Sequence, residues 1–333
     1  MGKCLITRLN GSVSNSSIPK IGEMRIKVLP IASPSKESQC FIFSFNKQAT
    51  VEIIGDGYFT DETLTLNNGK KVIIAPNVST SVYVSNGNFE ISILCKYDLI
   101  TILTYTLGLG VDNKDMSSID SLKYSYALEN INLPNTKAFG DIDGLKDLLN
   151  LKGINFSHTQ VSGDIGGLEK CVKLTNINMP NTQVSGDIGG LGKLTALTNI
   201  SLNNISVPFT GDIGNLKNLT KLKEVLIKSS TLTGDLATLP ESLRFASFDN
   251  DKGSTFTWST RPSSAKIIAI EGTATISNID KMLQDQAQCQ VGFSTNDQIW
   301  YKSISVSGTR TSASDAAVQT LQSKGYTVSV TPA

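Results

Sequence analysis

The ten residues TQVSGDIGGL occur twice in this chain, at Thr159–Leu168 and again at Thr182–Leu191. A catalytic motif has no obvious reason to recur in one chain, whereas a structural unit stacked on copies of itself does. The Gly-Asp step of the decamer belongs to a longer series. Its glycines follow one another at intervals of 23, 23, 25 and 23 residues: Gly140, Gly163, Gly186, Gly211 and Gly234. The spacing predicts a stack of similar coils.

Each repeat also carries apolar residues at the fixed spacing L-x-x-L-x-L. The five sets are Leu128, Ile131 and Leu133; Leu151, Ile154 and Phe156; Leu174, Ile177 and Met179; Leu197, Ile200 and Leu202; and Leu222, Val225 and Ile227. In a short strand with this spacing alternate side chains point inward. Because no coil can bury its own core, we expect stacked coils with parallel strands about 4.8 Å apart. The glycine is expected to make a tight bend on the return path.

The combination of L-x-x-L-x-L with T-x-V-S-G-D-I-G-G-L resembles a leucine-rich repeat of the long, glycine-containing type. The resemblance covers about Met116 to Asn250. The asparagine that usually follows the strand in this family is mostly threonine here, at Thr136, Thr159 and Thr182. A threonine hydroxyl can still bond neighbouring backbone amides, so the departure affects the repeat subtype more than the fold.

The residues on either side of the repeats have different patterns. Residues 1–97 consist of short β-rich segments such as CFIFSF and TSVYVS separated by turn formers, which predicts an antiparallel β-sandwich. The solenoid is placed at residues 98–250. In residues 251–333 strand-like segments alternate with helical ones, NIDKMLQDQA and ASDAAVQTLQSKG, and this segment is expected to cap the solenoid. The predicted fold class is therefore α+β, with a helix-containing C-terminal cap.

Composition excludes several classes of function. The 30 Lys and Arg residues against 29 Asp and Glu give a net charge of +1, so no nucleic-acid partner is expected. The five cysteines contain no C-x-x-C pair, which argues against a zinc site and favours buried free thiols. The most apolar run, residues 99–111, is too short to span a bilayer, so no membrane insertion is expected. The first residues lack the apolar core of a secretory signal.

An enzymatic centre is not predicted. His158 is the single histidine, and asparagine occupies its place in other repeats, so a surface repeat position is the favoured interpretation. The aspartates of the Gly-Asp steps form a column. Such a column fits a catalytic pair, a calcium ladder, or solvated turn residues that accept amide bonds from the next coil. The turn interpretation is favoured, and neither a metal nor a cofactor is expected.

The candidate ligand-binding residues lie between the inward-facing positions of the strands. The uncharged ones are Asn130, Asn132, Asn155, Asn176, Asn178, Asn199 and Ser201. Amide side chains suit neutral sugars, but they also form self-satisfied asparagine ladders, and a ladder or a solvated surface is favoured. Further along, the same face carries Glu224, Lys228 and Phe245, where a protein-binding hot spot is expected.

A second resemblance concerns the first residues. MGKCLITRLNGSVSNSSIPKIGEMRI, Met1–Ile26, is similar to the start of virion-surface and head-fibre proteins of crAss-like gut Bacteroides phages. It implies a structural protein of the virion surface, made in the host cytoplasm. Residues 1–97 would attach to the capsid or another virion protein, and the repeats would display a surface to a host glycan or protein. A homo-oligomer, with a trimer as one form, would follow for a fibre. The alternative is a bacterial cell-surface adhesin or protein-binding module built on leucine-rich repeats.

Overall fold

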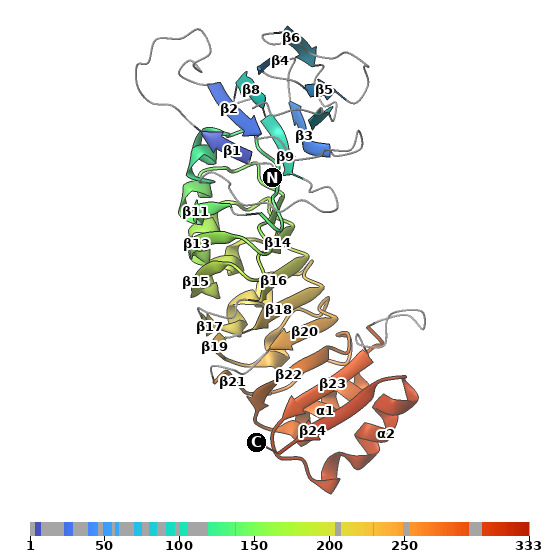
Figure 1. Ribbon diagram of the computed structural model, residues 1–333. Coiled ribbons are helices and arrows are strands. Elements are labelled where there is room, and N and C mark those ends of the chain that lie inside the picture. Colours follow the sequence, from blue (N-terminus) through green and yellow to red (C-terminus); the bar gives the residue numbers. More distant parts are fainter. Residues whose placement is uncertain are drawn as a thin grey trace. The chain divides into compact units, whose positions relative to one another are not determined.

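The computed structural model describes the backbone of the strands within residues 4–105, followed by residues 119–136, 138–203, 208–228, 230–248, 253–292 and 302–332 (Figure 1). The chain divides into two compact units, Met1–Gly163 and Asp164–Ala333. The repeat series runs through both units. The predicted boundaries after residues 97 and 250 mark changes in sequence pattern and stay predictions.

The first unit begins with strands that pair antiparallel in two sheets. One sheet has the order β1-β2-β8-β4-β6, formed by β1 (Cys4–Thr7), β2 (Glu23–Val28), β8 (Ile91–Lys96), β4 (Ala49–Ile54) and β6 (Lys70–Ile74). The other contains β5 (Gly57–Phe59), β7 (Thr80–Val84), β3 (Gln39–Phe45) and β9 (Ile100–Tyr105). Packing of side chains between the sheets lies outside the described residues, so the sandwich stays a prediction.

Strand β9 joins the antiparallel strands to the repeats. It pairs antiparallel with β3 on one side and parallel with β10 (Asn130–Asn132) on the other, where Leu103 is opposite Ile131. The sequence Ile100-x-x-Leu103-x-Tyr105 has the same spacing as the repeat motif. In the backbone pairing, β9 therefore occupies the position of a repeat strand ahead of the first predicted coil.

Each coil contains a short parallel strand, a second short strand that ends in Gly-Asp, and a 3-10 helix. In the first unit these elements are η1 (Ile119–Tyr124), β10, β11 (Phe139–Asp141), η2 (Ile142–Leu145), β12 (Gly153–Asn155) and β13 (Gln160–Asp164). Strands β10 and β12 pair in parallel with Ile131 opposite Ile154, so equivalent repeat positions lie side by side. The predicted parallel arrangement is confirmed.

The second unit continues the same pattern. Its repeat elements are η3 (Ile165–Lys170), β14 (Asn176–Asn178), β15 (Gln183–Asp187), η4 (Ile188–Lys193), β16 (Asn199–Asn203), β17 (Phe209–Asp212), η5 (Ile213–Asn218), β18 (Glu224–Lys228), β19 (Ser230–Thr233), η6 (Leu236–Thr238) and β20 (Phe245–Phe248). The strands β14, β16, β18 and β20 form one parallel row, and β15, β17 and β19 form another. The core lies between these two rows.

The core confirms the predicted ladder. All fifteen L-x-x-L-x-L residues are no more than 1% exposed, and so are the isoleucines that follow the Gly-Asp steps at 142, 165, 188 and 213. Burial of one leucine-sized side chain contributes about 1.5–3 kcal/mol to stability. The repeat region is thus a solenoid of leucine-rich coils, because each coil supplies inward side chains to a core that it shares with its neighbours.

The Gly-Asp step has two linked functions in the coil. The aspartate accepts a hydrogen bond from the amide two residues later and caps the 3-10 helix of its own coil, as Asp164 Oδ1 does with Gly166 N at 2.8 Å and Asp187 Oδ1 with Gly189 N at 2.6 Å. The expectation that the column accepts amide bonds from the next coil is therefore incomplete. Asp235 does both, since it also accepts from Ser259 N at 3.1 Å.

The glycine of the step packs against the preceding coil. Gly186 has φ +105°, and a Cβ at this position would lie 2.3 Å from Oδ1 of Asp164, one coil earlier. Gly211 is placed in the same way, with φ +114° and 2.4 Å to Oδ1 of Asp187. The decamer recurs because a capping aspartate in one coil requires a residue without a side chain in the next.

The threonines after the strands close the turn, as the sequence predicted. Thr159 is buried, and its hydroxyl donates to the carbonyl of Phe156 at 2.7 Å while accepting from Val161 N at 3.5 Å. Thr182 makes the equivalent bonds with Met179 O at 3.0 Å and Val184 N at 3.3 Å. These hydroxyls therefore replace the family's asparagine as the link between strand and return segment.

The residue before this threonine has a left-handed backbone conformation. Asn135, His158 and Asn181 have φ values of 55°, 56° and 54°. Asparagine tolerates this region better than other residues with a side chain, whereas histidine is less favourable. His158 is exposed and lies at a repeat turn, which agrees with the surface interpretation made from the sequence.

We expect His158→Asn to stabilise the protein by about 0.5–1 kcal/mol, because asparagine fits the positive φ of this turn at a lower conformational cost. Urea unfolding followed by circular dichroism measures the difference. His158→Ala is the matched control, since it removes the same imidazole but does not supply the tolerance of asparagine for a positive φ. An asparagine variant no more stable than the alanine variant would contradict the backbone explanation.

The C-terminal segment continues the parallel sheet and adds two α-helices. Its elements are β21 (Thr255–Phe256), β22 (Ala269–Ile276), α1 (Ile279–Gln288), β23 (Ser303–Ser307), η8 (Ser312–Ser314), α2 (Asp315–Ser323) and β24 (Thr327–Thr331). Strands β20, β22, β23 and β24 follow one another in parallel, so the coils continue here, and the expected alternation of strands and helices is confirmed. The core of the last coil is less covered, because Val328 and Val330 are partly exposed.

Buried polar groups connect this segment to the last repeat. Arg261 is 3% exposed, and its guanidinium donates to the carbonyls of Leu239 at 2.9 Å and Pro240 at 3.1 Å. Asp285 accepts from Trp258 Nε1 at 3.0 Å and from the backbone amide of Arg261 at 3.1 Å. Burial by itself would raise the pKa of Asp285, but its hydrogen bonds, first among them that from Lys281, outweigh burial and lower it.

Candidate binding surface on the repeat strands

The asparagines of the first unit form a short ladder. Asn130 and Asn132 lie on either side of buried Ile131 in β10, and Asn155 follows buried Ile154 in β12. The side-chain amide of Asn155 donates to Oδ1 of Asn132 at 2.8 Å, and its own oxygen accepts from Ser157. The ladder interpretation thus describes Asn132 and Asn155, whose amides bond within the protein. Whether these residues bind a ligand stays a prediction.

In the second unit the outward face changes in character from strand to strand. Asn176, Asn178, Asn199 and Ser201 occupy outward positions of β14 and β16, as predicted. Asn199 Nδ2 donates to Oε2 of Glu224 on the next strand at 2.9 Å, which links the amide column to the charged one. Strand β18 then presents Glu224, Leu226 and Lys228 between buried Val225 and Ile227. The surface therefore combines amide, hydroxyl, carboxylate, ammonium and apolar groups.

Phe245 differs from the expectation. Its backbone lies opposite Glu224 in the parallel register, an outward position, yet its side chain is only 2% exposed. Ser247, the next outward residue of β20, is 7% exposed. A phenyl ring gains free energy when it is withdrawn from water, and here the outward face of β20 is covered. The expected exposure of Phe245 is therefore wrong, and its part in a protein-binding hot spot stays a prediction.

Glu271 is a further outward residue, on β22, that sequence analysis did not single out. It is partly buried, and this burial raises the pKa of its carboxyl, while the positive charge of Lys228 acts in the opposite direction. The charge of Lys228 on β18 therefore acts on the carboxyl of Glu271 across the outward face. The sequence alone does not indicate Glu271, because the L-x-x-L-x-L motif is not preserved in β22. Its outward position follows from the pairing of β22 with β20, in which Glu271 lies opposite Ser247.

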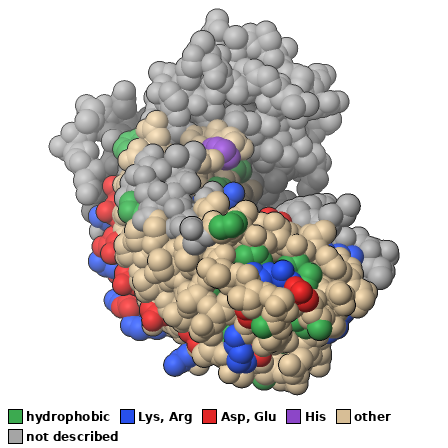
Figure 2. All heavy atoms as spheres, turned by 90° about the horizontal axis from the view of Figure 1, so that it is seen from below, with side chains coloured by type: hydrophobic (Ala, Val, Ile, Leu, Met, Phe, Trp, Pro, Cys, Tyr) green, Lys and Arg blue, Asp and Glu red, His purple; other side chains and the backbone are tan. Residues whose placement is uncertain are grey.

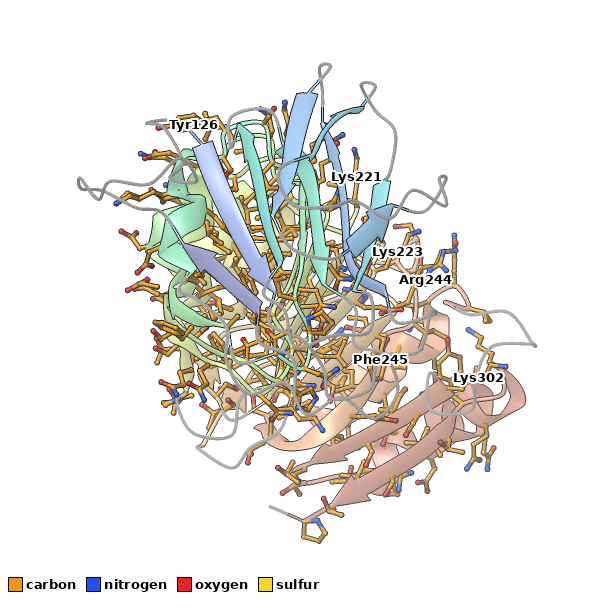
Figure 3. The ribbon with its side chains drawn as sticks, turned by 45° about the horizontal axis from the view of Figure 1, so that its top comes forward. Tyr126, Lys221, Lys223, Arg244, Phe245 and Lys302 are labelled. Atoms are coloured by element: carbon orange, nitrogen blue, oxygen red, sulfur yellow. The ribbon has the colours of Figure 1, made fainter. Side chains whose placement is uncertain are left out.

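Sequence analysis also missed a group of basic residues in the loops that lead into the outward strands. They are Lys221, Lys223, Arg244, Lys266 and Lys302, and the name cationic edge is used for these five residues. Figure 3 shows Lys221, Lys223, Arg244 and Lys302 one after another beside the strands. Their common position, just before a strand, is the signal that was present in the sequence.

The residues that the sequence offered for catalysis, His158 and the aspartates of the Gly-Asp steps, occupy structural positions in the coil. The capping aspartates engage backbone amides, and His158 lies at a turn. Within the described ranges there is no group of three or more His, Cys, Asp or Glu side chains suited to a metal ion. Across the same ranges, no helix has the length and apolar content needed to cross a bilayer. A cavity of about 360 Å³ lies beside β24, lined by residues that include Arg310, Val318, Val328 and Val330.

Solved structures with a similar fold include several receptor proteins. PEPR1-AtPEP1 is 21% identical with a TM-score of 0.38, and the match covers 47% of this chain and 24% of that one. The leucine-rich-repeat ectodomain of the receptor kinase SOBIR1 from Arabidopsis thaliana is 21% identical with a TM-score of 0.30, covering 42% of this chain and 70% of that one. A TDR receptor is 15% identical with a TM-score of 0.47, and the match covers 66% of this chain and 38% of that one.

This chain thus spans about a quarter of the PEPR1-AtPEP1 chain it matches. No family model matches the sequence. No curated protein matches it either. The coil geometry of the chain itself, with parallel strands and a shared leucine core, defines the repeat region as a solenoid.

Proposed function

We propose that this chain is a non-enzymatic protein-binding module and that its contact surface is the outward face of the repeat strands. The observation that carries the proposal is a contrast between repeat positions within one chain. The turn segment TQVSGDIGGL is identical in two coils, while the outward strand residues change from Asn176 and Asn178 to Glu224, Leu226 and Lys228. Positions that build the coil meet the same packing demands in every repeat, whereas outward positions are free to differ.

The chemistry of the outward face fits a polypeptide partner. Leu226 is partly exposed between a carboxylate and an ammonium group, so apolar and charged contacts lie on one strand. The amides of β14 and β16 add donors and acceptors on the neighbouring strands. Protein interfaces combine an apolar centre with polar groups around it, and this mixture is present on β14, β16 and β18.

A random peptide display library selected on the full chain tests the proposal. We expect the enriched peptides to lose binding to the variant Leu226→Lys with Lys228→Glu, and to keep binding to the control Gln183→Lys, which changes an exposed residue of β15 in the other row of strands. Circular dichroism confirms that both variants fold. Absence of enriched peptides, or equal loss in both variants, would count against the outward face as the contact surface.

A finer proposal concerns the biological setting, a phage virion surface on which residues 1–97 attach to the capsid. It is supported by the resemblance of Met1–Ile26 alone. Copurification of the protein with intact particles would support it, and its absence from purified particles would contradict it.

Light scattering of the full chain tests the associated proposal of a homo-oligomer, for which a trimer and a monomer give clearly different masses. Glycan binding by the amide column is a separate expectation, tested with neutral oligosaccharides.

A further inference from the structure

We propose that the cationic edge docks an acidic, extended segment of a protein partner. The proposal rests on the proposed function and adds to it the chemistry of the partner and a second part of the contact surface. The five residues of the edge come from four separate loops of the second unit, in front of β18, β20, β22 and β23.

The parallel register brings these residues together. Arg244 N donates to the carbonyl of Lys223 at 2.9 Å, and Ala269 N donates to the carbonyl of Arg244 at 2.8 Å, so Lys223 and Arg244 occupy successive levels of the stack. Lys302 immediately precedes β23, which pairs with β22, and therefore lies two levels beyond Arg244. From Lys223 to Lys302 the row covers three strand spacings, about 14 Å, which an extended peptide matches with about five residues.

The positive charge of the edge is only partly offset. Elsewhere in the second unit basic side chains pair with acids, for example Lys193 with Glu169 at 2.5 Å. Among the described residues Lys221, Lys223 and Arg244 have no such ion pair, and Lys266 Nζ donates to the neutral Gln290 Oε1 at 2.8 Å.

Two carboxylates, Glu224 and Glu241, lie within three residues of a member of the edge in the sequence, and both have other hydrogen-bond partners. Glu224 accepts from Asn199 at 2.9 Å, and Glu241 accepts from Ser264 Oγ at 3.1 Å. Figure 2 shows a different arrangement along one margin of the face it presents, where acidic and basic side chains are interspersed. Lys221, Lys223 and Arg244 thus carry positive charge that these two acids only partly offset, and an acidic partner complements it.

Apolar groups beside the edge favour a polypeptide over an anionic polysaccharide. Val291 is 44% exposed, and the adjacent Gly292 lies against Arg244, since a Cβ on Gly292 would be 3.8 Å from Cβ of Arg244. Leu226 is partly exposed on β18, two residues after Glu224. An acidic peptide brings both carboxylates and apolar side chains to such a surface, whereas a polysaccharide brings only hydroxyl and anionic groups.

The probe is a fluorescent peptide of about eight residues in which Glu alternates with Leu and Ser, long enough to cover the row. Its control has Gln in place of every Glu. Fluorescence anisotropy measures binding to the full chain. We expect the Glu peptide to bind at least about tenfold more tightly than the Gln peptide, and its affinity to fall as salt rises from about 50 to about 200 mM.

The decisive variant is Lys223→Glu with Arg244→Glu, which reverses two charges on successive levels. We expect it to weaken binding of the Glu peptide roughly tenfold or more. Lys217→Glu is the control, because Lys217 is exposed at the end of η5 and changes the net charge of the chain in the same direction. Lys223→Gln with Arg244→Gln separates loss of attraction from added repulsion, and thermal unfolding shows that each variant folds.

Three outcomes would overturn the proposal. The first is equal weakening by the control variant, which would show a net-charge effect without a site. The second is no binding of the Glu peptide. The third is tighter binding of a heparin fragment than of the Glu peptide with the same dependence on Lys223 and Arg244, which would assign the edge to an anionic polysaccharide. The two proposals can fail separately. If library peptides need Leu226 but bind the Lys223→Glu and Arg244→Glu variant normally, the proposed function stands and the proposal for the cationic edge fails.

Discussion

Gly186→Ala is expected to lower the free energy of unfolding by about 2–5 kcal/mol, one of the two largest effects predicted for a single substitution in this chain. Two costs combine. An alanine at φ +105° is strained, and its Cβ would approach Oδ1 of Asp164 to 2.3 Å and Cγ to 2.7 Å. Asp164 has little freedom to retreat, because the same oxygen caps η3 through Gly166 N.

Gly253→Ala separates these two costs. Gly253 has φ +95°, but a Cβ there meets no atom within 4 Å, so the substitution introduces backbone strain without a clash. Urea denaturation followed by circular dichroism gives both values. We expect the Gly186 variant to lose clearly more stability than the Gly253 variant. Equal losses would show that packing between the glycine and the preceding coil's aspartate has no measurable cost, and the explanation for the repeated decamer would fail.

Arg261→Met is expected to destabilise the protein by about 3 kcal/mol, although methionine keeps much of the apolar length of the side chain. Replacing both partners of a buried polar pair with apolar groups can be nearly neutral, but here the acceptors are backbone carbonyls that no substitution removes. The carbonyls of Leu239 and Pro240 would lose the guanidinium as a donor. Burial lowers the pKa of Arg261, because the charged guanidinium is less well solvated there than in water.

Arg261→Lys tests the geometry of the same site. An ammonium group donates from one point, whereas the guanidinium reaches separate carbonyls with a planar fork, so we expect lysine to recover less than half of the loss. Arg310→Met is the matched control, because Arg310 pairs with Asp315 at the surface and its removal costs about 0.5 kcal/mol or less. Thermal and urea unfolding of the three variants give the comparison. A methionine variant as stable as the parent would mean that the buried carbonyls find other partners.

The strand face shows where prediction from sequence reached its limit. Asn176, Asn199 and Glu224 were placed correctly as outward residues, because alternation within a strand follows from the motif. The same rule placed Phe245 outward, and its backbone is indeed in that register, but the side chain is buried. Burial of an outward residue depends on what lies over the strand, and the period of the motif contains no information about that covering.

The amino-acid sequence by itself determined the coil period, the L-x-x-L-x-L core, the parallel strands and the threonines that close the turns after β10, β12 and β14. These features follow from local spacing, since a side chain's direction within a strand depends on its place in the motif. The tertiary structure decided the contacts between coils. It placed Asp164 against Gly186, joined β9 to the repeat strand β10, and set Lys223, Arg244 and Lys302 in one row. Such contacts depend on the stagger of one coil against the next, which arises only when the coils stack.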